Sequence, residues 1–314
     1  MKVNGSKDDL ELMEARKQRI WRWPAAINFV LGGTGAGFYL FAALIELIHE
    51  DPGAFTHRAY PFPAPLLVCL GLLAVSFEAG RPFRAVHLLK RLQSSWISIE
   101  IMAGALFVFF ATAGWIFPSV ILLICSSSAA LGFILSQGFI IYRARAITGW
   151  SVPLIPMLFF TTALAAGGGL LLILSSFLMI SHGEITLMMV QAFIVMDVTA
   201  WAIYLTWSRD RNFIRATGLL RRYFSLFIIS GIGHLLPFAA IAGLLVARQT
   251  GYSFTEFPIT ALVGAFIIFG VVSGKIFLIL GVNFMRPMVL SGEYVLNLKR
   301  SSKFSGGTAG KTDA

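Results

Sequence analysis

Three polar residues, Asn28, Glu100 and Gln137, each lie five or six positions inside a separate apolar stretch. At about 1.5 Å per helical residue they would share one level, about 8–9 Å below the helix ends. Amides both donate and accept hydrogen bonds, and a buried carboxyl group can carry a proton. Such a set suits a ligand with carbonyl oxygens. Hydrogen bonding between helices for the amides, or a carboxylate at the headgroup level for Glu100, would explain the same residues without a ligand.

A second group of ionisable residues lies deeper in the apolar stretches. Asp197 and Lys275 are each about ten residues from a helix end, which is roughly 15 Å, and His234 lies near the middle of its stretch, between Gly233 and Pro237. Ionisable groups in a bilayer are costly, so they usually pair with each other or line a path. Asp197 and Lys275 therefore predict either a buried structural ion pair or a proton path. His234 is predicted to be either a hydrogen-bonded core residue or a member of that path.

Metal chemistry is not expected in this chain. Cys69 and Cys125 lie in apolar runs, without the spacing of an iron–sulfur or zinc site. Of the five histidines only His234 is deep in an apolar stretch. Because a b-type haem needs axial ligands such as paired histidines, we predict no haem and no metal.

The elements that must position these residues are apolar helices. The sequence is 57% hydrophobic and only 13% charged, whereas a soluble domain carries about 25% charged residues. In lipid, a helical bundle satisfies every backbone polar group. The sequence therefore predicts an all-α, polytopic membrane protein with eight transmembrane helices, at about 22–48, 64–80, 95–117, 119–142, 153–179, 184–207, 222–247 and 257–285. Six tryptophans near helix ends fit an interfacial belt: Trp21, Trp23, Trp96, Trp115, Trp150 and Trp207.

The positive charges predict the orientation of these helices. Except for Arg58, Arg248 and Lys275, every Lys and Arg lies in a terminal segment or in the loops after the second, fourth and sixth helices. Loops that face the cytoplasm collect Lys and Arg, so both termini are predicted to be cytoplasmic. This topology also accounts for the net charge of +10 without a nucleic-acid partner. We expect an N-terminal segment 1–21, a membrane domain 22–287 and a cytoplasmic tail 288–314.

Two features recur along the chain. Glycine-rich runs occur at 33–37 and 167–169, and the basic segments RPFRAVHLLKR (81–91) and RNFIRATGLLRR (211–222) are alike. Chance similarity between basic loops is one explanation. The other is a duplication into two four-helix halves, about 22–148 and 149–287. The glycines are expected to allow close helix packing.

One segment resembles a known family. Residues 76–82 read SFEAGRP, residues 93–98 read QSSWIS, and Trp21 and Trp23 precede a glycine-rich first helix. This pattern is similar to that of the polysulfide reductase NrfD-type family, which includes the dimethyl sulfoxide reductase membrane anchors (DmsC-like). Ala79 replaces the usual Leu of the motif, and Glu78 stands where Asp is frequent.

The resemblance implies a function in electron transfer. Such subunits exchange electrons between a quinone, menaquinone or ubiquinone, and a docked iron–sulfur subunit with four clusters, which serves a catalytic subunit with a molybdenum or tungsten pterin. The resemblance also implies that the protein lies in the inner (cytoplasmic) membrane. The predicted orientation places its partner subunits in the cytoplasm. The positions that fit a quinone site are Asn28, Arg81, Trp96, Gln137 and Tyr142, with Glu100 and Glu78 as proton carriers. Asp197, His234 and Lys275 would form a proton path.

Two other functions remain open at this point. Eight helices, an internal repeat and scattered intramembrane charges are also found in secondary transporters. A passive membrane anchor without a quinone site is the second alternative.

Overall fold

The computed structural model describes residues 11–13, 21–48, 62–78, 95–180, 183–250, 256–282, 284–285 and 288–290. The chain forms two compact units. One comprises residues 19–283, and the other joins residues 1–18 to residues 284–314.

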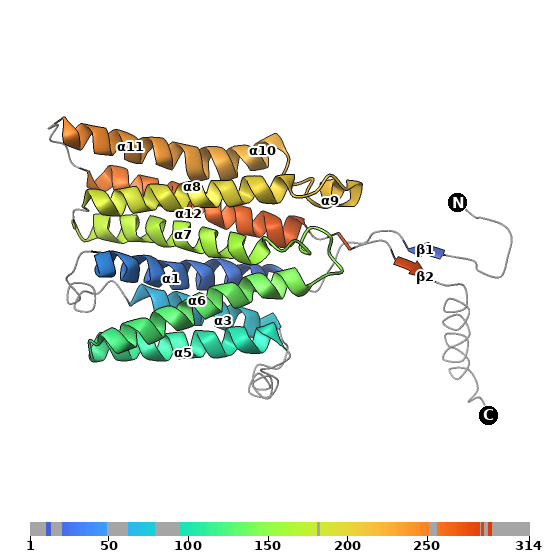
Figure 1. Ribbon diagram of the computed structural model, residues 1–314, viewed down its shortest axis with the longest axis horizontal. Helices are drawn as coiled ribbons and strands as arrows, with labels where there is room; N and C mark the ends of the chain where they lie inside the picture. The colour runs from blue at the N-terminus through green and yellow to red at the C-terminus, as the bar shows by residue number, and fades with distance from the viewer. Residues whose placement is uncertain are drawn as a thin grey trace, which may run out of the picture. The chain divides into compact units, whose positions relative to one another are not determined.

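The larger unit consists of helices and the loops between them (Figure 1). The predicted helix positions are confirmed to within a few residues, except that the last helix ends earlier than predicted, at Gly281. The helices are α1 (Trp23–Ile48), α3 (Pro63–Glu78), α5 (Trp96–Ile116), α6 (Val120–Arg143), α7 (Ile155–Phe177), α8 (Glu184–Thr206), α9 (Arg211–Ala216), a continuous run of α10 (Tyr223–Leu226), η3 (Phe227–Leu235) and α11 (Leu236–Gln249), and a second run of α12 (Phe257–Ile276) and η4 (Phe277–Gly281).

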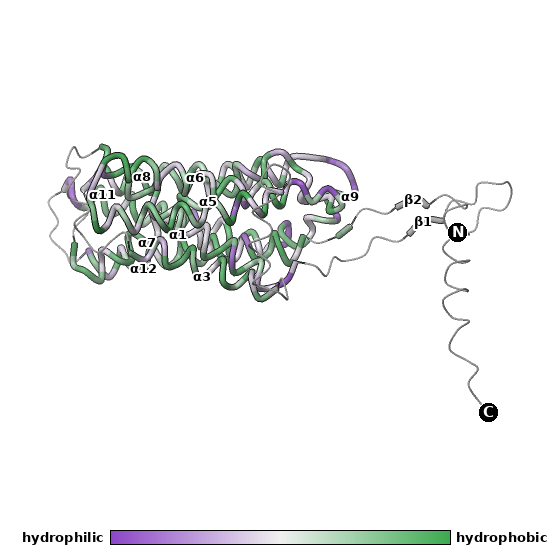
Figure 2. Tube along the Cα trace, turned by 90° about the horizontal axis from the view of Figure 1, so that it is seen from below, coloured by the Kyte–Doolittle hydropathy of each residue, from purple (hydrophilic) through white to green (hydrophobic). Residues whose placement is uncertain are grey.

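Among the described residues, seven helices are long and apolar enough to cross a membrane. Hydrophobic residues extend along the length of these helices (Figure 2). The helix α3 differs, because its 16 residues span about 24 Å at 1.5 Å per residue, which is less than the hydrocarbon thickness of about 30 Å. The eighth transmembrane crossing therefore stays a prediction.

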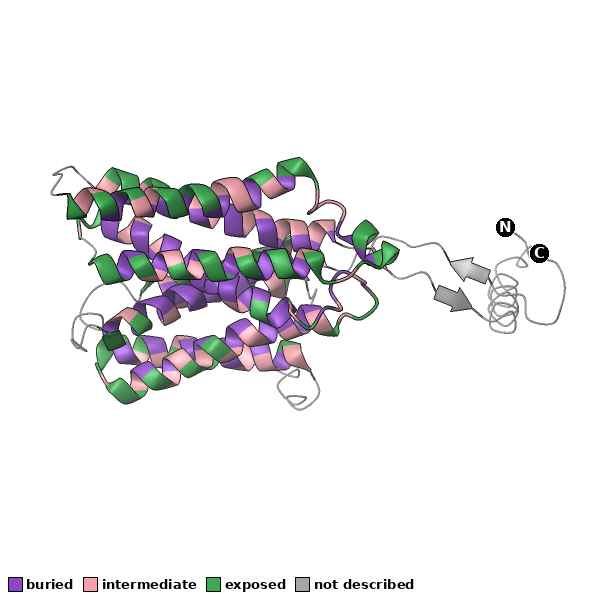
Figure 3. Ribbon diagram, turned by 45° about the horizontal axis from the view of Figure 1, so that its top comes forward, coloured by how far each residue is buried: buried purple, intermediate pink, exposed green. Residues whose placement is uncertain are grey.

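The helices α1 and α7 form the centre of the bundle. They are the most buried of the seven candidate spans, and buried residues face inward while exposed ones face outward (Figure 3). Helix α1 contacts α3, α6 and α7, whereas α7 contacts α6, α8 and α12. The same succession of neighbours around α1 and α7 is what a duplicated four-helix unit would produce.

Glycines allow the two central helices to cross closely. A Cβ atom on Gly37 would overlap the backbone of Ala163, and one on Gly167 would overlap the backbone of Gly37. Such contacts let helix backbones approach each other in lipid. The packing role expected for the glycine-rich runs is confirmed at this crossing.

Two π-helical segments interrupt the last two long helices. The segment η3 contains His234 and ends two residues before Pro237 of α11, while η4 begins two residues after Lys275. π-Helical turns widen the backbone spiral and are frequent at functional sites. Each interruption thus lies beside a residue that the sequence marked as ionisable and buried.

The smaller unit adds the only strands among the described residues. The strand β1 (Glu11–Met13) pairs antiparallel with β2 (Met288–Leu290), with Leu12 opposite Val289. The all-α prediction is thus correct for the larger unit, while this pairing joins the N-terminal segment to the C-terminal tail, a contact that was not predicted.

Candidate functional site

Asn28, Glu100 and Gln137 meet in the structure, and we call them the polar triad. They come from α1, α5 and α6. Glu100 Oε1 accepts hydrogen bonds from Asn28 Nδ2 at 2.8 Å and from Gln137 Nε2 at 3.1 Å. Gln137 Nε2 is also 3.3 Å from the backbone oxygen of Asn28. Since none of the three is more than 4% exposed, the shared depth predicted from the sequence corresponds to direct contact.

Two oxygens of the polar triad remain without a donor. Asn28 Oδ1 and Gln137 Oε1 are buried, and neither has a hydrogen-bond partner in the structure. A buried acceptor left unpaired costs about 1–3 kcal/mol, so buried polar atoms of this kind call for a specific explanation. Both oxygens are suited to accept hydrogen bonds from a ligand.

A cavity of about 630 Å³ opens at the end of the bundle nearest the polar triad. It is lined by Trp21, Ser95, Trp96, Ile97, Ile99, Ile140, Arg143 and Ala144. Ile99 directly precedes Glu100, and Ile140 lies one helical turn beyond Gln137. The cavity therefore reaches the layer directly outside the polar triad, although no triad residue lines it.

Aromatic rings form part of this cavity. Trp96 stacks on Phe139 with 4.3 Å between ring centroids, and Trp21 stacks on Phe29 at 5.7 Å. Of the predicted ring contacts, only Trp96 lines the cavity. Tyr142 is not among the lining residues, and its ring centroid lies 6.4 Å from that of Phe139. The prediction of Trp96 as a wall residue fits the geometry better than that of Tyr142.

Two predicted site residues fall outside what the structure describes. Arg81 lies outside the described residues, and Glu78 is the last residue of α3, with a side chain that is not described. Their predicted roles stay untested.

A second buried polar centre lies in the other half of the bundle. Asp197 on α8 accepts a hydrogen bond from Thr161 Oγ1 at 2.9 Å, and its second oxygen is 2.9 Å from His234 Nε2. His234 Nδ1 is 2.6 Å from the backbone oxygen of Ile229 in η3. Both ring nitrogens of His234 thus have partners, as expected for a hydrogen-bonded core histidine.

Lys275 does not form the ion pair that was considered for it. Its Nζ atom donates to the backbone oxygen of Phe29 at 3.0 Å and lies 5.4 Å from the ring centroid of Phe159. The partner of Asp197 is His234 instead. The structural ion pair of Asp197 with Lys275 is therefore wrong, because the lysine side chain donates to the backbone oxygen of Phe29 in α1.

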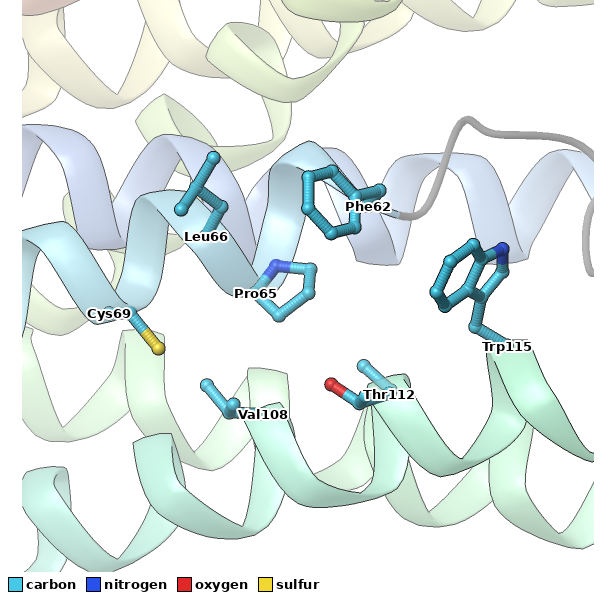
Figure 4. A pocket seen from close by; sticks show the side chains of 8 residues that line it. Phe62, Pro65, Leu66, Cys69, Val108, Thr112 and Trp115 are labelled. Carbon is cyan, nitrogen blue, oxygen red and sulfur yellow. The ribbon is translucent and has the colours of Figure 1, made fainter.

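A second, smaller cavity of about 180 Å³ lies between α3 and α5 (Figure 4). Its walls are almost entirely apolar and comprise Phe62, Pro65, Leu66, Cys69, Val108, Ala111, Thr112 and Trp115. Without convergent polar groups, this groove suits a hydrocarbon chain better than a reacting ligand. Within the described part of the chain, no three His, Cys, Asp or Glu side chains gather where they could hold a metal ion.

Sequence analysis missed several contributors to these centres. Thr161 carried no charge to mark it, and the backbone oxygen of Phe29 cannot be recognised from residue type. Arg143 was counted only for topology, yet it lines the large cavity. A hydroxyl within an apolar helix, such as Thr161, is the one signal of this kind that the sequence offers.

These observations define the class of the protein first. Seven helices able to cross a membrane, packed around polar side chains that meet at depth, form a multi-pass membrane protein. Residues 17–217 match the model of the family described as DMSO reductase anchor subunit (DmsC), and the chain belongs to this family. No curated protein matches the chain. The matched residues contain the polar triad, Thr161 and Asp197, whereas His234 and Lys275 lie beyond them.

Proposed function

We propose that this protein is the membrane anchor and quinone-reactive subunit of a multi-subunit oxidoreductase. It passes electrons between the quinone pool and a docked iron–sulfur subunit that serves a catalytic subunit with a molybdenum or tungsten pterin. The observation that carries the proposal is the polar triad with its two unpaired amide oxygens, in a chain that belongs to the DMSO reductase anchor family.

The residues present fit a quinone or quinol. A quinone, when bound, takes up two electrons and two protons. Asn28 Oδ1 and Gln137 Oε1 are acceptors available to the hydroxyl groups of the reduced form. Turning either amide would present an N–H donor to the carbonyl groups of the oxidised form. Glu100, held between both amides, is the group of the polar triad that can hold or release a proton.

The large cavity supplies the entry to the polar triad. Trp21 and Trp96 offer flat apolar faces for a ring. Ile99 and Ile140 line the cavity and no triad residue does, so a ring reaches the amides only after side chains of the cavity wall move. Arg143 at the mouth of the cavity keeps its charge toward water.

Family membership implies that catalytic and iron–sulfur subunits dock on the anchor. We place them in the cytoplasm, with four clusters in the iron–sulfur subunit. The large cavity and the basic loop residues Arg143, Arg145, Arg209, Arg211 and Arg215 belong to helix ends that the positive-inside rule assigns to that side of the inner membrane. A short electron path then joins the docked subunit to the polar triad.

The experiment replaces each amide of the polar triad by an apolar side chain of similar size. Asn28→Leu and Gln137→Leu are expected to lower quinol turnover and bound quinone in the purified complex, each by about tenfold or more, because a site built on hydrogen bonds rejects its ligand when they are lost. Ser175→Ala is the matched control, since Ser175 is buried and bonds carbonyls of its own helix. Normal turnover in both leucine variants at normal assembly would contradict the site and favour a passive anchor.

The composition of the purified complex distinguishes the proposed function from the transporter alternative. Copurification with iron–sulfur and pterin subunits in mild detergent is expected. Recovery of the chain alone, with solute transport after reconstitution into vesicles, would overturn the proposed function. Transporter repeats carry helix breaks at matching positions, whereas the π-helical segments of the described residues occur only in the second half, in η3 and η4.

A further inference from the structure

The polar triad and the second polar centre approach each other at one glycine of α1. A Cβ atom on Gly33 would overlap Lys275 Nζ and would lie 3.4 Å from Gln137 Oε1. The ammonium group and the amide oxygen therefore face each other across the space that a side chain at Gly33 would fill. Gln137 Oε1 is one of the two acceptors of the polar triad that lack a donor.

Two consecutive carbonyl groups of α1 reinforce this approach. Gln137 Nε2 bonds the oxygen of Asn28, and Lys275 Nζ bonds the oxygen of Phe29. Helix α1 thus holds one side chain from each half of the bundle, at neighbouring peptide groups. Lys275 is 1% exposed, and an ammonium group has three protons to donate, so it can serve Phe29 and a second acceptor together.

The second polar centre borders the helix that carries Lys275. Asp197 is bonded to His234, and His234 lies in η3, which packs against α12. His234 Nδ1 is in turn 2.6 Å from the backbone oxygen of Ile229 within η3.

We propose that Lys275 is the second proton donor of the quinone site and that it reaches the polar triad through the space left by Gly33. This inference rests on the proposed function. Reduction of a quinone consumes two electrons from the docked iron–sulfur carrier and two protons, one from Glu100 and one from Lys275. Oxidation of a quinol runs both transfers in reverse, so that Glu100 and Lys275 each take up one proton.

The family match does not supply this residue. Lys275 and His234 both lie outside residues 17–217, the part of the chain that the family model covers. The proposed contact of Lys275 with the polar triad follows instead from how α1, α6 and α12 meet at Gly33.

The first test concerns the geometry and needs no turnover. Gly33→Ala is expected to lower the melting temperature of the quinone-free complex in detergent, because the new methyl group overlaps Lys275 Nζ. When Lys275 is replaced by Ala the overlap is absent. Adding Gly33→Ala to Lys275→Ala should therefore lower the melting temperature by less than Gly33→Ala does in the protein that retains Lys275. Gly243→Ala is the control, since no atom lies within 4 Å of its added Cβ. An equal drop in melting temperature on Gly33→Ala, with and without Lys275, would overturn the proposed contact.

The second test concerns proton transfer in the whole complex. Lys275→Met is expected to slow quinol turnover by about 10²-fold, the range of one general acid–base group, at quinone affinity within about twofold of the unchanged protein. The solvent deuterium isotope effect on turnover should rise, and methylamine should restore part of the turnover of Lys275→Ala. Normal turnover in Lys275→Met, with Asn28→Leu inactive, would overturn the proton-donor role of Lys275 and leave the quinone site standing. Normal turnover in Asn28→Leu and Gln137→Leu would overturn the site itself.

Discussion

Asn28 Nδ2 lies 2.8 Å from Glu100 Oε1, although 72 residues separate them in the sequence. The same carboxylate oxygen accepts a hydrogen bond from Gln137 on a third helix. One oxygen atom therefore joins α1, α5 and α6, and loss of that oxygen would remove the acceptor of both amides at once.

Glu100→Gln separates proton transfer from hydrogen bonding. The amide oxygen of glutamine can still accept from Asn28 and Gln137, but the side chain no longer carries a proton. We expect normal assembly with quinol turnover lowered by about 10²-fold, measured on the purified complex. Glu256→Gln is a matched control, because Glu256 pairs with Arg248 away from the polar triad. Unchanged turnover in Glu100→Gln would remove Glu100 from the proton chemistry.

Gly37→Val tests the crossing of the two central helices. The added side chain would overlap the backbone of Ala163, so α1 and α7 must separate. We expect little assembled complex in the membrane, measured by the amount of chain that copurifies with its partners. Gly243→Val, placed where an added Cβ meets no atom within 4 Å, should assemble normally. Normal assembly of Gly37→Val would show that this crossing is not needed.

The pair of Asp197 and His234 is expected to be coupled in stability. Removing one partner of a buried hydrogen-bonded pair costs about 1–3 kcal/mol, because the other is left unsatisfied. His234→Leu and Asp197→Leu should therefore each lower the free energy of unfolding, while the double variant should lose clearly less than the sum. Reversible unfolding in detergent with a denaturant provides the measurement. Additive losses would mean that the two side chains act independently.

The predicted orientation can be tested by labelling. In a chain with Cys69 and Cys125 replaced by Ala, Ser119→Cys places one thiol in the short turn between α5 and α6, which the predicted orientation assigns to the side opposite the termini. We expect it to react with a membrane-impermeant maleimide from outside the cytoplasm. A cysteine replacing Arg145 should react only after the membrane is opened. The reverse pattern would contradict cytoplasmic termini.

The positions of the helices follow from the sequence because apolar length is a local property. The polar triad was also predictable, since three polar residues at one depth in three helices have few other partners in lipid. Trp150 shows where such reasoning fails. Its place near a helix end suggested an interfacial residue, yet it is fully buried and donates to the backbone oxygen of Leu278 at 2.9 Å.

Pairing between distant helices is harder to predict than depth. Asp197 had two possible partners of suitable depth, and only the packing of η3 against α12 and α8 decides that His234 is the one. Lys275 bonds a backbone oxygen, an acceptor that every residue offers. Residue type therefore gave no signal for this contact, nor for the open space at Gly33.

The bonds of Gln137 and Lys275 to consecutive peptide groups of α1 bear on how the two halves could have evolved. If the halves arose by duplication, they have since ceased to be exchangeable modules, because α1 supplies acceptors to both. The second half alone would leave Lys275 buried in the bilayer without its acceptor, the backbone oxygen of Phe29 in the first half. Selection would then favour genes that encode both halves together, which keeps the two halves within a single polypeptide.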